Sequence, residues 1–91
     1  MSALRAIIRG RVQGVGYRYY ILRLAQELGI AGYVKNRRDG SVEVFAQGYE
    51  SRLKEFMDRI RKPRQPIEVT EVNIQQALVK PGFVSFRIEY E

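Results

Sequence analysis

The residues from Arg11 to Arg18 have the types and spacing of an anion-binding loop. Gly14 and Gly16 stand two positions apart, and a residue without a Cβ adopts positive φ angles at little cost. Backbone N–H groups in such a turn converge on one point, where they bind anions such as phosphate. Arg18 comes directly after the glycines, and its planar guanidinium forms paired hydrogen bonds with phosphate oxygens. The loop and its arginine together predict a site for a phosphorylated ligand.

Two widespread phosphate-binding motifs do not fit this loop. A dinucleotide-binding loop needs a third glycine three residues after the second, and this chain has Tyr19 there. A P-loop needs Gly-Lys followed by Ser or Thr, which the chain lacks. Two glycines alone more often form a structural turn. However, arginine is unfavourable at the positive end of a helix dipole, and a bound anion would explain why Arg18 stands there.

The composition limits the chemistry that such a site could perform. The 91 residues include no cysteine and no histidine, which removes thiol nucleophiles, disulfides, cysteine-based zinc sites and the commonest general base. Chemistry must then rely on arginine, lysine, amides, tyrosine, carboxylates and water. The net charge is +6, and 12 of the 16 basic residues are arginine, so the chain attracts phosphorylated metabolites, nucleic acid or acidic surfaces.

The length and the apolar pattern indicate one cytoplasmic domain, residues 1–91, with a single modest core. No stretch of about 18 apolar residues is present, so we expect no membrane partner. Residues 1–5 lack the apolar segment of a signal peptide. We expect a monomer, although an exposed edge of the fourth or the last strand could pair between chains.

Two segments have the i, i+3, i+4, i+7 apolar spacing of amphipathic helices. The first covers residues 18–28 and is followed by Gly29, a residue typical of helix C-termini. The second covers residues 50–61 and stops before Pro63, because proline cannot continue a helix. The apolar positions are Ile21, Leu24, Ala25 and Leu28 in the first segment and Leu53, Phe56, Met57 and Ile60 in the second.

The remaining segments alternate between apolar and polar residues, as β-strands do. An Asp-Gly pair at positions 39 and 40 predicts a hairpin turn. Val69 and Val72 are out of phase and indicate a bulge or a late start in the fourth strand. The order βαββαβ plus a C-terminal strand predicts an α+β, ferredoxin-like two-layer α/β sandwich, an antiparallel sheet with two helices on one face. The strands are expected at residues 3–11, 30–36, 41–48, 67–76 and 84–90.

Two blocks of the sequence resemble the signature of the acylphosphatase family. Residues 10–18 read Gly-x-Val-Gln-Gly-Val-Gly-Tyr-Arg. Residues 25–43 read Ala-x-x-Leu-Gly-x-x-Gly-x-Val-x-Asn-x-x-Asp-Gly-x-Val-Glu, with Asn36 at the spacing of the family pattern. The resemblance is close over residues 10–48 and looser afterwards, and at the level of the fold it covers the whole chain. No position expected to carry chemistry departs from the pattern.

The resemblance implies an acylphosphatase, an enzyme that hydrolyses the carboxyl–phosphate bond of acyl phosphates to carboxylate and inorganic phosphate. It implies two catalytic residues: Arg18 binds the phosphate, and Asn36 positions the attacking water. An acyl phosphate has a good leaving group and its transfer relies on positioning and charge stabilisation, so no metal and no cofactor are expected. The phosphate is expected to lie on the backbone amides of Gln13, Gly14, Val15, Gly16, Tyr17 and Arg18.

Other functions remain open at this stage. RNA-recognition domains share the ferredoxin-like topology, and a basic nucleic-acid-binding module would explain the charge. Such modules need exposed aromatic residues on the central strands, where this chain offers Phe45 alone, so we expect no nucleic acid partner. A regulatory relative of the acylphosphatases is a third possibility, but it would normally have lost Arg18 or Asn36. Taken without the family pattern, Asn36 is typical of a turn.

Overall fold

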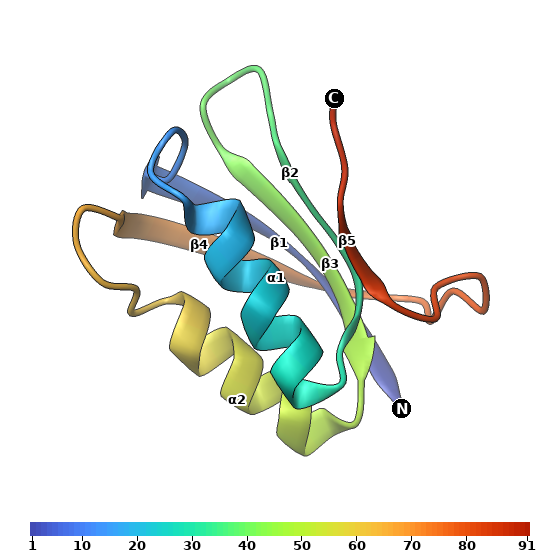
Figure 1. The fold of residues 1–91 in the computed structure, drawn as a ribbon. Helices are drawn as coiled ribbons and strands as arrows, with labels where there is room; N and C mark the ends of the chain where they lie inside the picture. The colour runs from blue at the N-terminus through green and yellow to red at the C-terminus, as the bar shows by residue number, and fades with distance from the viewer.

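The computed structural model describes all 91 residues and contains one five-stranded sheet with both helices on the same face (Figure 1). The elements follow one another in the predicted order, which confirms the ferredoxin-like α+β arrangement. The elements are β1 (Ser2–Arg11), α1 (Tyr17–Leu28), β2 (Ala31–Asn36), β3 (Val42–Gly48), α2 (Glu50–Ile60), β4 (Glu68–Ala77) and β5 (Phe86–Ile88).

The sheet is mixed, so the prediction of a purely antiparallel sheet was wrong. The strands lie in the order β4-β1-β3-β2-β5. All neighbours from β4 to β2 are antiparallel, but β5 is parallel to β2, with Gly32 opposite Phe86 and Val34 opposite Ile88. The chain reverses after β4 and crosses to the far edge of the sheet (Figure 1). There, β2 already runs in the new direction, and the added strand is therefore parallel to it.

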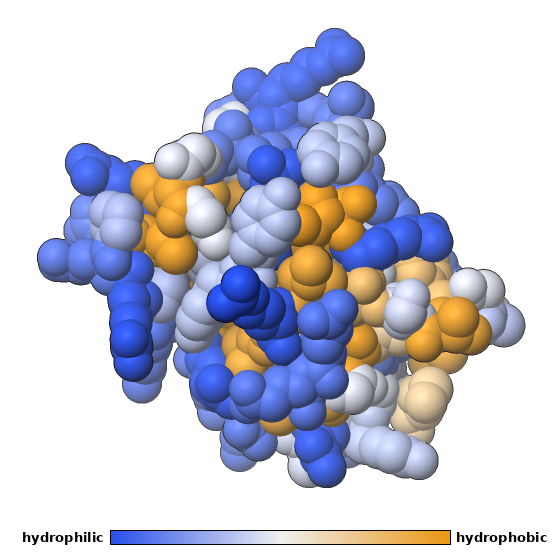
Figure 2. Space-filling view, in the orientation of Figure 1, coloured by the Kyte–Doolittle hydropathy of each residue, from blue (hydrophilic) through white to orange (hydrophobic).

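Both helices bury the apolar stripes that the sequence predicts. All eight predicted positions are buried in one cluster, which also contains the helix-facing residues of the sheet. Each fully buried large apolar side chain stabilises the fold by about 1.5–3 kcal/mol. The face shown in Figure 2 is mostly hydrophilic, with apolar areas between the hydrophilic side chains. α1 begins at Tyr17, one residue earlier than predicted, and α2 ends at Ile60, one residue earlier.

The face of the sheet away from the helices is also partly closed. Every residue of β3 is buried. Phe45 points to this face and is only 1% exposed, because the rings of Tyr33 and Phe83 pack against it and Lys80 lies 4.7 Å above its centroid. The aromatic residue that a nucleic-acid-binding module would need on its surface is therefore covered.

The outer strands differ from the prediction in detail. β4 contains the predicted irregularity, because its register against β1 shifts between Arg9 and Gly10 and leaves Thr70 without a partner strand residue. Gly10 has a φ of 133°, and a Cβ there would lie 2.2 Å from a backbone oxygen of β4, so only glycine fits. β5 keeps only the middle three residues of the predicted range 84–90. Val84 is 90% exposed on the connection from β4, where an apolar area extends to the right in Figure 2.

Candidate active site

The loop between β1 and α1 has left-handed backbone at both predicted glycines. Gly14 has a φ of 72° and Gly16 a φ of 81°. Gly16 is the N-cap of α1 and offers no side chain to the first turn of the helix. None of the backbone N–H groups of residues 13–18 donates a hydrogen bond within the chain. These amides lie at the positive end of a helix dipole and are available to an anion.

Side chains of the same loop anchor its backbone. Tyr17 is buried, and its hydroxyl donates to the carbonyl of Ile60 at the end of α2. Burial raises the pKa of Tyr17 far above its ordinary value, so the phenol stays a donor. Val15 packs against the core, and the Gln13 side chain donates to the turn between β2 and β3. Two of the predicted phosphate-binding residues, Val15 and Tyr17, can therefore contribute only backbone.

Arg18 lies in the first turn of α1 and keeps its charge uncompensated. Its guanidinium forms no ion pair, whereas five of the twelve arginines of the chain pair with carboxylates. The Cζ of Arg18 lies 5.4 Å from the ring centroid of Tyr90. A cation–π contact of this kind restrains the guanidinium without neutralising it. Arg18 can therefore still bind an anion with full charge.

Asn36 is the last residue of β2 and pairs with Val42 across the hairpin. Its side-chain Oδ1 is buried and accepts no hydrogen bond from the chain. A buried acceptor without a donor costs about 1–3 kcal/mol, and such groups are rare in native proteins. A water molecule that donates to Oδ1 would remove this cost. The unpaired Oδ1 of Asn36 is therefore a candidate acceptor for a water molecule.

Arg18 and Asn36 line the same cavity, which has a volume of about 360 Å³. The fold thus brings together the two residues that the sequence singled out. The other lining residues were missed, because no periodicity or motif marks them in the sequence. Several come from the C-terminal segment, which reaches the cavity because β5 pairs with β2 and the N–H of Glu89 donates to the carbonyl of Val34. They are Arg37, Arg38, Glu89, Tyr90 and Glu91.

Comparison with known proteins identifies the family. The acylphosphatase family model matches residues 4–88. The chain belongs to the acylphosphatase family. An acylphosphatase from Moorella thermoacetica is 46% identical over 90 residues, covering 97% of this chain and 96% of that protein. An acylphosphatase from Bacillus licheniformis is 41% identical over 90 residues, covering 99% and 100% of the two chains.

The same family appears among solved structures. The crystal structure of the acylphosphatase from Bacillus subtilis matches this acylphosphatase-family chain with a TM-score of 0.94 at 38% identity. The match covers 99% of this chain and 100% of that one. The likeness therefore includes the loop, both helices and all strands that surround the cavity.

In this member of the acylphosphatase family, the turn beside Asn36 is closed by Asp39. The Oδ1 of Asp39 accepts hydrogen bonds from the Ser41 N–H at 3.0 Å and from the Ser41 hydroxyl at 2.5 Å. These bonds lower the pKa of Asp39 to about 2. Gly40 has a φ of 93°. The prediction that Asp39 and Gly40 form the turn is confirmed.

Behind the turn, Glu43 compensates the charge of Arg37. The Nη1 of Arg37 lies 2.9 Å from the Glu43 Oε1, and the Nη2 of Arg5 lies 3.1 Å from the same oxygen. Tyr33 donates its hydroxyl to the other carboxylate oxygen. Burial opposes the ionisation of Glu43, but the bonds from Tyr33 and Arg5 outweigh it and lower the pKa. Arg37 is therefore less available to an anion than Arg18.

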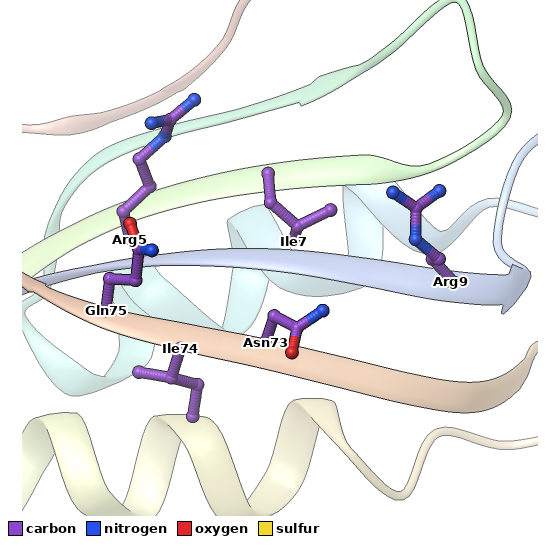
Figure 3. A pocket seen from close by; sticks show the side chains of 6 residues that line it. All are labelled: Arg5, Ile7, Arg9, Asn73, Ile74 and Gln75. Atoms are coloured by element: carbon purple, nitrogen blue, oxygen red, sulfur yellow. The ribbon is translucent and has the colours of Figure 1, made fainter.

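A larger cavity, of about 420 Å³, lies between β1 and β4 on the other face of the sheet (Figure 3). Arg5 and Arg9 extend from β1 along this cavity (Figure 3). Both are paired, Arg5 with Glu43 at 3.1 Å and Arg9 with Asp39 at 3.4 Å. Both of its arginines are paired with carboxylates, so this cavity suits a phosphate less well than the cavity at Arg18.

The groups that could bind metal ions are dispersed. No three or more of the aspartate and glutamate side chains gather where they could hold a metal ion. Neither helix is both long and apolar enough to cross a membrane. Three arginines and the two glutamates Glu89 and Glu91 line the Arg18 cavity, whereas residues 13–17 of the loop are not among its lining residues.

Proposed function

We propose that this chain hydrolyses acyl phosphates at the cavity between Arg18 and Asn36. Water is added across the carboxyl–phosphate anhydride, which yields a carboxylate and inorganic phosphate. One observation carries the proposal: Arg18, whose guanidinium has no carboxylate partner, and Asn36, whose buried Oδ1 has no hydrogen-bond donor, line the same cavity. The first group fits a phosphate and the second fits a water, which are the two reactants of this hydrolysis.

Arg18 and the loop amides bind the phosphate in the proposed site. The guanidinium forms two parallel hydrogen bonds with phosphate oxygens. The amides of residues 13–18 are unbonded within the chain and already ordered by the two left-handed glycines. They stabilise the charge that spreads over the phosphoryl oxygens in the loose transition state, and they do so without reorganising.

Asn36 positions the attacking water. The water donates one hydrogen bond to the Oδ1 of Asn36 and directs a lone pair at the phosphorus, opposite the acyl oxygen. The new P–O bond forms while the bond between phosphorus and the acyl oxygen breaks, and the carboxylate leaves with the electron pair. An amide oxygen is too weak a base to take the proton, so the proton passes to a phosphoryl oxygen of the substrate.

The deciding experiment measures hydrolysis of a simple aromatic acyl phosphate by the wild type, with and without a chelator. We expect activity in both cases, because arginine and amides perform the charge stabilisation. Loss of activity with chelator would show that a metal takes part. Arg18→Ala and Asn36→Ala are measured alongside, and full activity in both variants would contradict the assignment of the site.

We further propose that residues 1–91 act as a single cytoplasmic domain and as a monomer. We propose that the partner is a small-molecule substrate and that the chain binds no nucleic acid. The burial of Phe45 supports this, because the ring is not exposed for stacking on a base. Sedimentation velocity tests the monomer, and titration with single-stranded oligonucleotides at several salt concentrations tests the nucleic acid alternative. Salt-dependent micromolar binding would support that alternative instead.

A further inference from the structure

The side chain of Gln13 joins the phosphate loop to the turn that follows Asn36. Its Nε2 lies 2.7 Å from the carbonyl oxygen of Arg37 and 2.8 Å from that of Ser41. Both hydrogens of the amide are thereby used. These are the only side-chain hydrogen bonds between residues 12–18 and the turn.

The turn is closed without Gln13. The Arg37 N–H donates to the Ser41 carbonyl at 2.8 Å, and the Gly40 N–H donates to the Arg37 carbonyl at 3.2 Å. Asp39 adds two further bonds from Ser41. Both carbonyls that Gln13 contacts therefore keep another partner if Gln13 is removed. The contribution of Gln13 is to attach the turn to the loop rather than to form the turn.

We propose that Gln13 is a positioning residue, whose side-chain amide sets the placement of Asn36 relative to the phosphate held by the loop and Arg18. The inference rests on the proposed function. Arg37 directly follows Asn36, so the bond to its carbonyl acts within one residue of the water-holding side chain. In-line attack depends on this relative placement, and a misplacement of about 1 Å can lower a rate by about 100-fold.

The chemistry of the contact requires two donors on one planar nitrogen. Glutamine supplies them, and at this position any acceptor would face two carbonyl oxygens. Gln13→Glu keeps the shape and replaces the donors with acceptors, which the carbonyls repel. Gln13→Met keeps the approximate length and forms no hydrogen bond. The two variants therefore distinguish the effect of the Gln13 hydrogen bonds from the effect of its side-chain size.

The test compares kcat and KM of the wild type, Gln13→Met, Gln13→Glu, Asn36→Ala and the double variant Gln13→Met/Asn36→Ala. We expect Gln13→Met to lower kcat by about 10- to 100-fold, with KM changed by less than about threefold because the loop amides and Arg18 remain. Gln13→Glu is expected to lower kcat further. With Asn36 already absent, Gln13→Met should lower kcat by less than about twofold, because Gln13 acts through Asn36.

Gln47 provides a matched control. Its Nε2 donates to the carbonyls of Lys80 and Phe83 at 2.9 and 3.3 Å, and it lies at the other end of β3. Gln47→Met also removes bonds to two carbonyls, together with a bond that the Lys80 N–H donates to the Gln47 Oε1 at 2.8 Å. It should therefore lower the melting temperature but leave kcat unchanged. Equal kcat values for Gln13→Met and Gln47→Met would overturn the proposal. So would an undiminished loss of kcat from Gln13→Met in the Asn36→Ala background.

A second measurement is independent of catalysis. The side-chain N–H signals of Asn36 are followed by NMR while inorganic phosphate is added. We expect the signals to shift in the wild type and in Gln47→Met, and to shift less than half as far in Gln13→Met at saturating phosphate. An identical shift in Gln13→Met would overturn the role of Gln13. An inactive wild type would contradict the proposed function, and the NMR comparison would still decide the positioning role.

Discussion

Among single residues, Arg18 has no carboxylate partner within the chain and the Oδ1 of Asn36 has no hydrogen-bond donor. Arg18 has a charge without a counter-charge, and Asn36 has a buried acceptor without a donor. The unpaired Oδ1 of Asn36 reduces the stability of the fold because it is buried, whereas the guanidinium of Arg18 is only half-buried. Their position on one cavity is explained if a phosphate completes the first and a water completes the second.

Replacement of Arg18 tests the anion site. Arg18→Ala is expected to lower kcat/KM by about 100- to 1,000-fold and to weaken competitive inhibition by inorganic phosphate. Arg18→Lys keeps the charge but loses the bidentate geometry, so its kcat/KM should lie between those of the wild type and Arg18→Ala. Steady-state kinetics with phosphate as inhibitor measures both effects. Arg23→Ala, an exposed arginine of the same helix, is the control, and the assignment fails if it has the same effect as Arg18→Ala.

Replacement of Asn36 separates activity from stability. Asn36→Ala is expected to lower kcat by about 100-fold and to leave the inhibition constant of phosphate unchanged. The free energy of unfolding should stay equal or rise, because the variant removes an unsatisfied buried acceptor. Kinetics and urea denaturation measure the two quantities, with Asn73→Ala on exposed β4 as the control. A stability loss as large as the activity loss would indicate a structural role instead.

At the scale of elements, the site depends on a loop, a helix start and a hairpin turn that are anchored separately. The loop is held by Tyr17 on the helix side and by Gln13 on the turn side. The turn is held by Asp39 and, behind it, by the Glu43 ion pairs. Preorganisation of the proposed site therefore comes from contacts outside the cavity.

Asp39 in the turn makes the free energy of unfolding depend on pH in the acidic range. The ordinary pKa of Asp39 is 3.8, and its hydrogen bonds from Ser41 lower this to about 2 in the folded chain. The lowered folded pKa means that Asp39 stabilises the fold above about pH 4 and that this stabilisation is lost as pH falls toward 2. Between about pH 4 and pH 2, the free energy of unfolding measured with urea should fall less steeply in Asp39→Asn than in the wild type. Asp58→Asn on α2 is the control, and identical slopes for wild type and Asp39→Asn would refute this role.

At the scale of the whole molecule, the parallel addition of β5 brings the C-terminal segment to the cavity. The chain crosses from one edge of the sheet to the other between β4 and β5 (Figure 1). Tyr90 then lies against Arg18, and the Arg38 N–H donates to the Oε1 of Glu91 at 2.6 Å. The last residues of the sequence thus complete a site whose other members come from its first half.

The contact with Tyr90 is expected to contribute to phosphate binding. A cation–π contact at an exposed site is worth about 0.5–1 kcal/mol. Tyr90→Leu should therefore raise KM and the inhibition constant of phosphate by about two- to fivefold, whereas Tyr90→Phe should have little effect. Tyr49→Leu is the control, since Tyr49 is 70% exposed and Tyr90 is 76% exposed. Unchanged KM in Tyr90→Leu would show that the ring does not restrain Arg18.

Much of the fold and the centre of the candidate site could be predicted. The apolar stripes of both helices, the Asp39–Gly40 turn and the irregularity of β4 are confirmed, because each is encoded by residues within a few positions of one another. The direction of β5 was wrong, and the burial of Phe45 was not anticipated. Both depend on contacts with residues that are distant in the sequence, where no local period indicates the partner.

The residue pattern alone was enough to specify the conformation of the loop before α1, since glycines occupy its two left-handed positions. The composition also led to the chemistry that we propose, because a chain without histidine and cysteine lacks the commonest general base and the thiol nucleophile. Three properties became visible only in the folded chain: Arg18 lacks a carboxylate partner, the Oδ1 of Asn36 is unpaired, and Gln13 joins the loop to the turn. These properties depend on which atoms come into contact when the strands pair across the sheet. The residue pattern of one segment does not specify its contacts with a segment that is distant in the sequence.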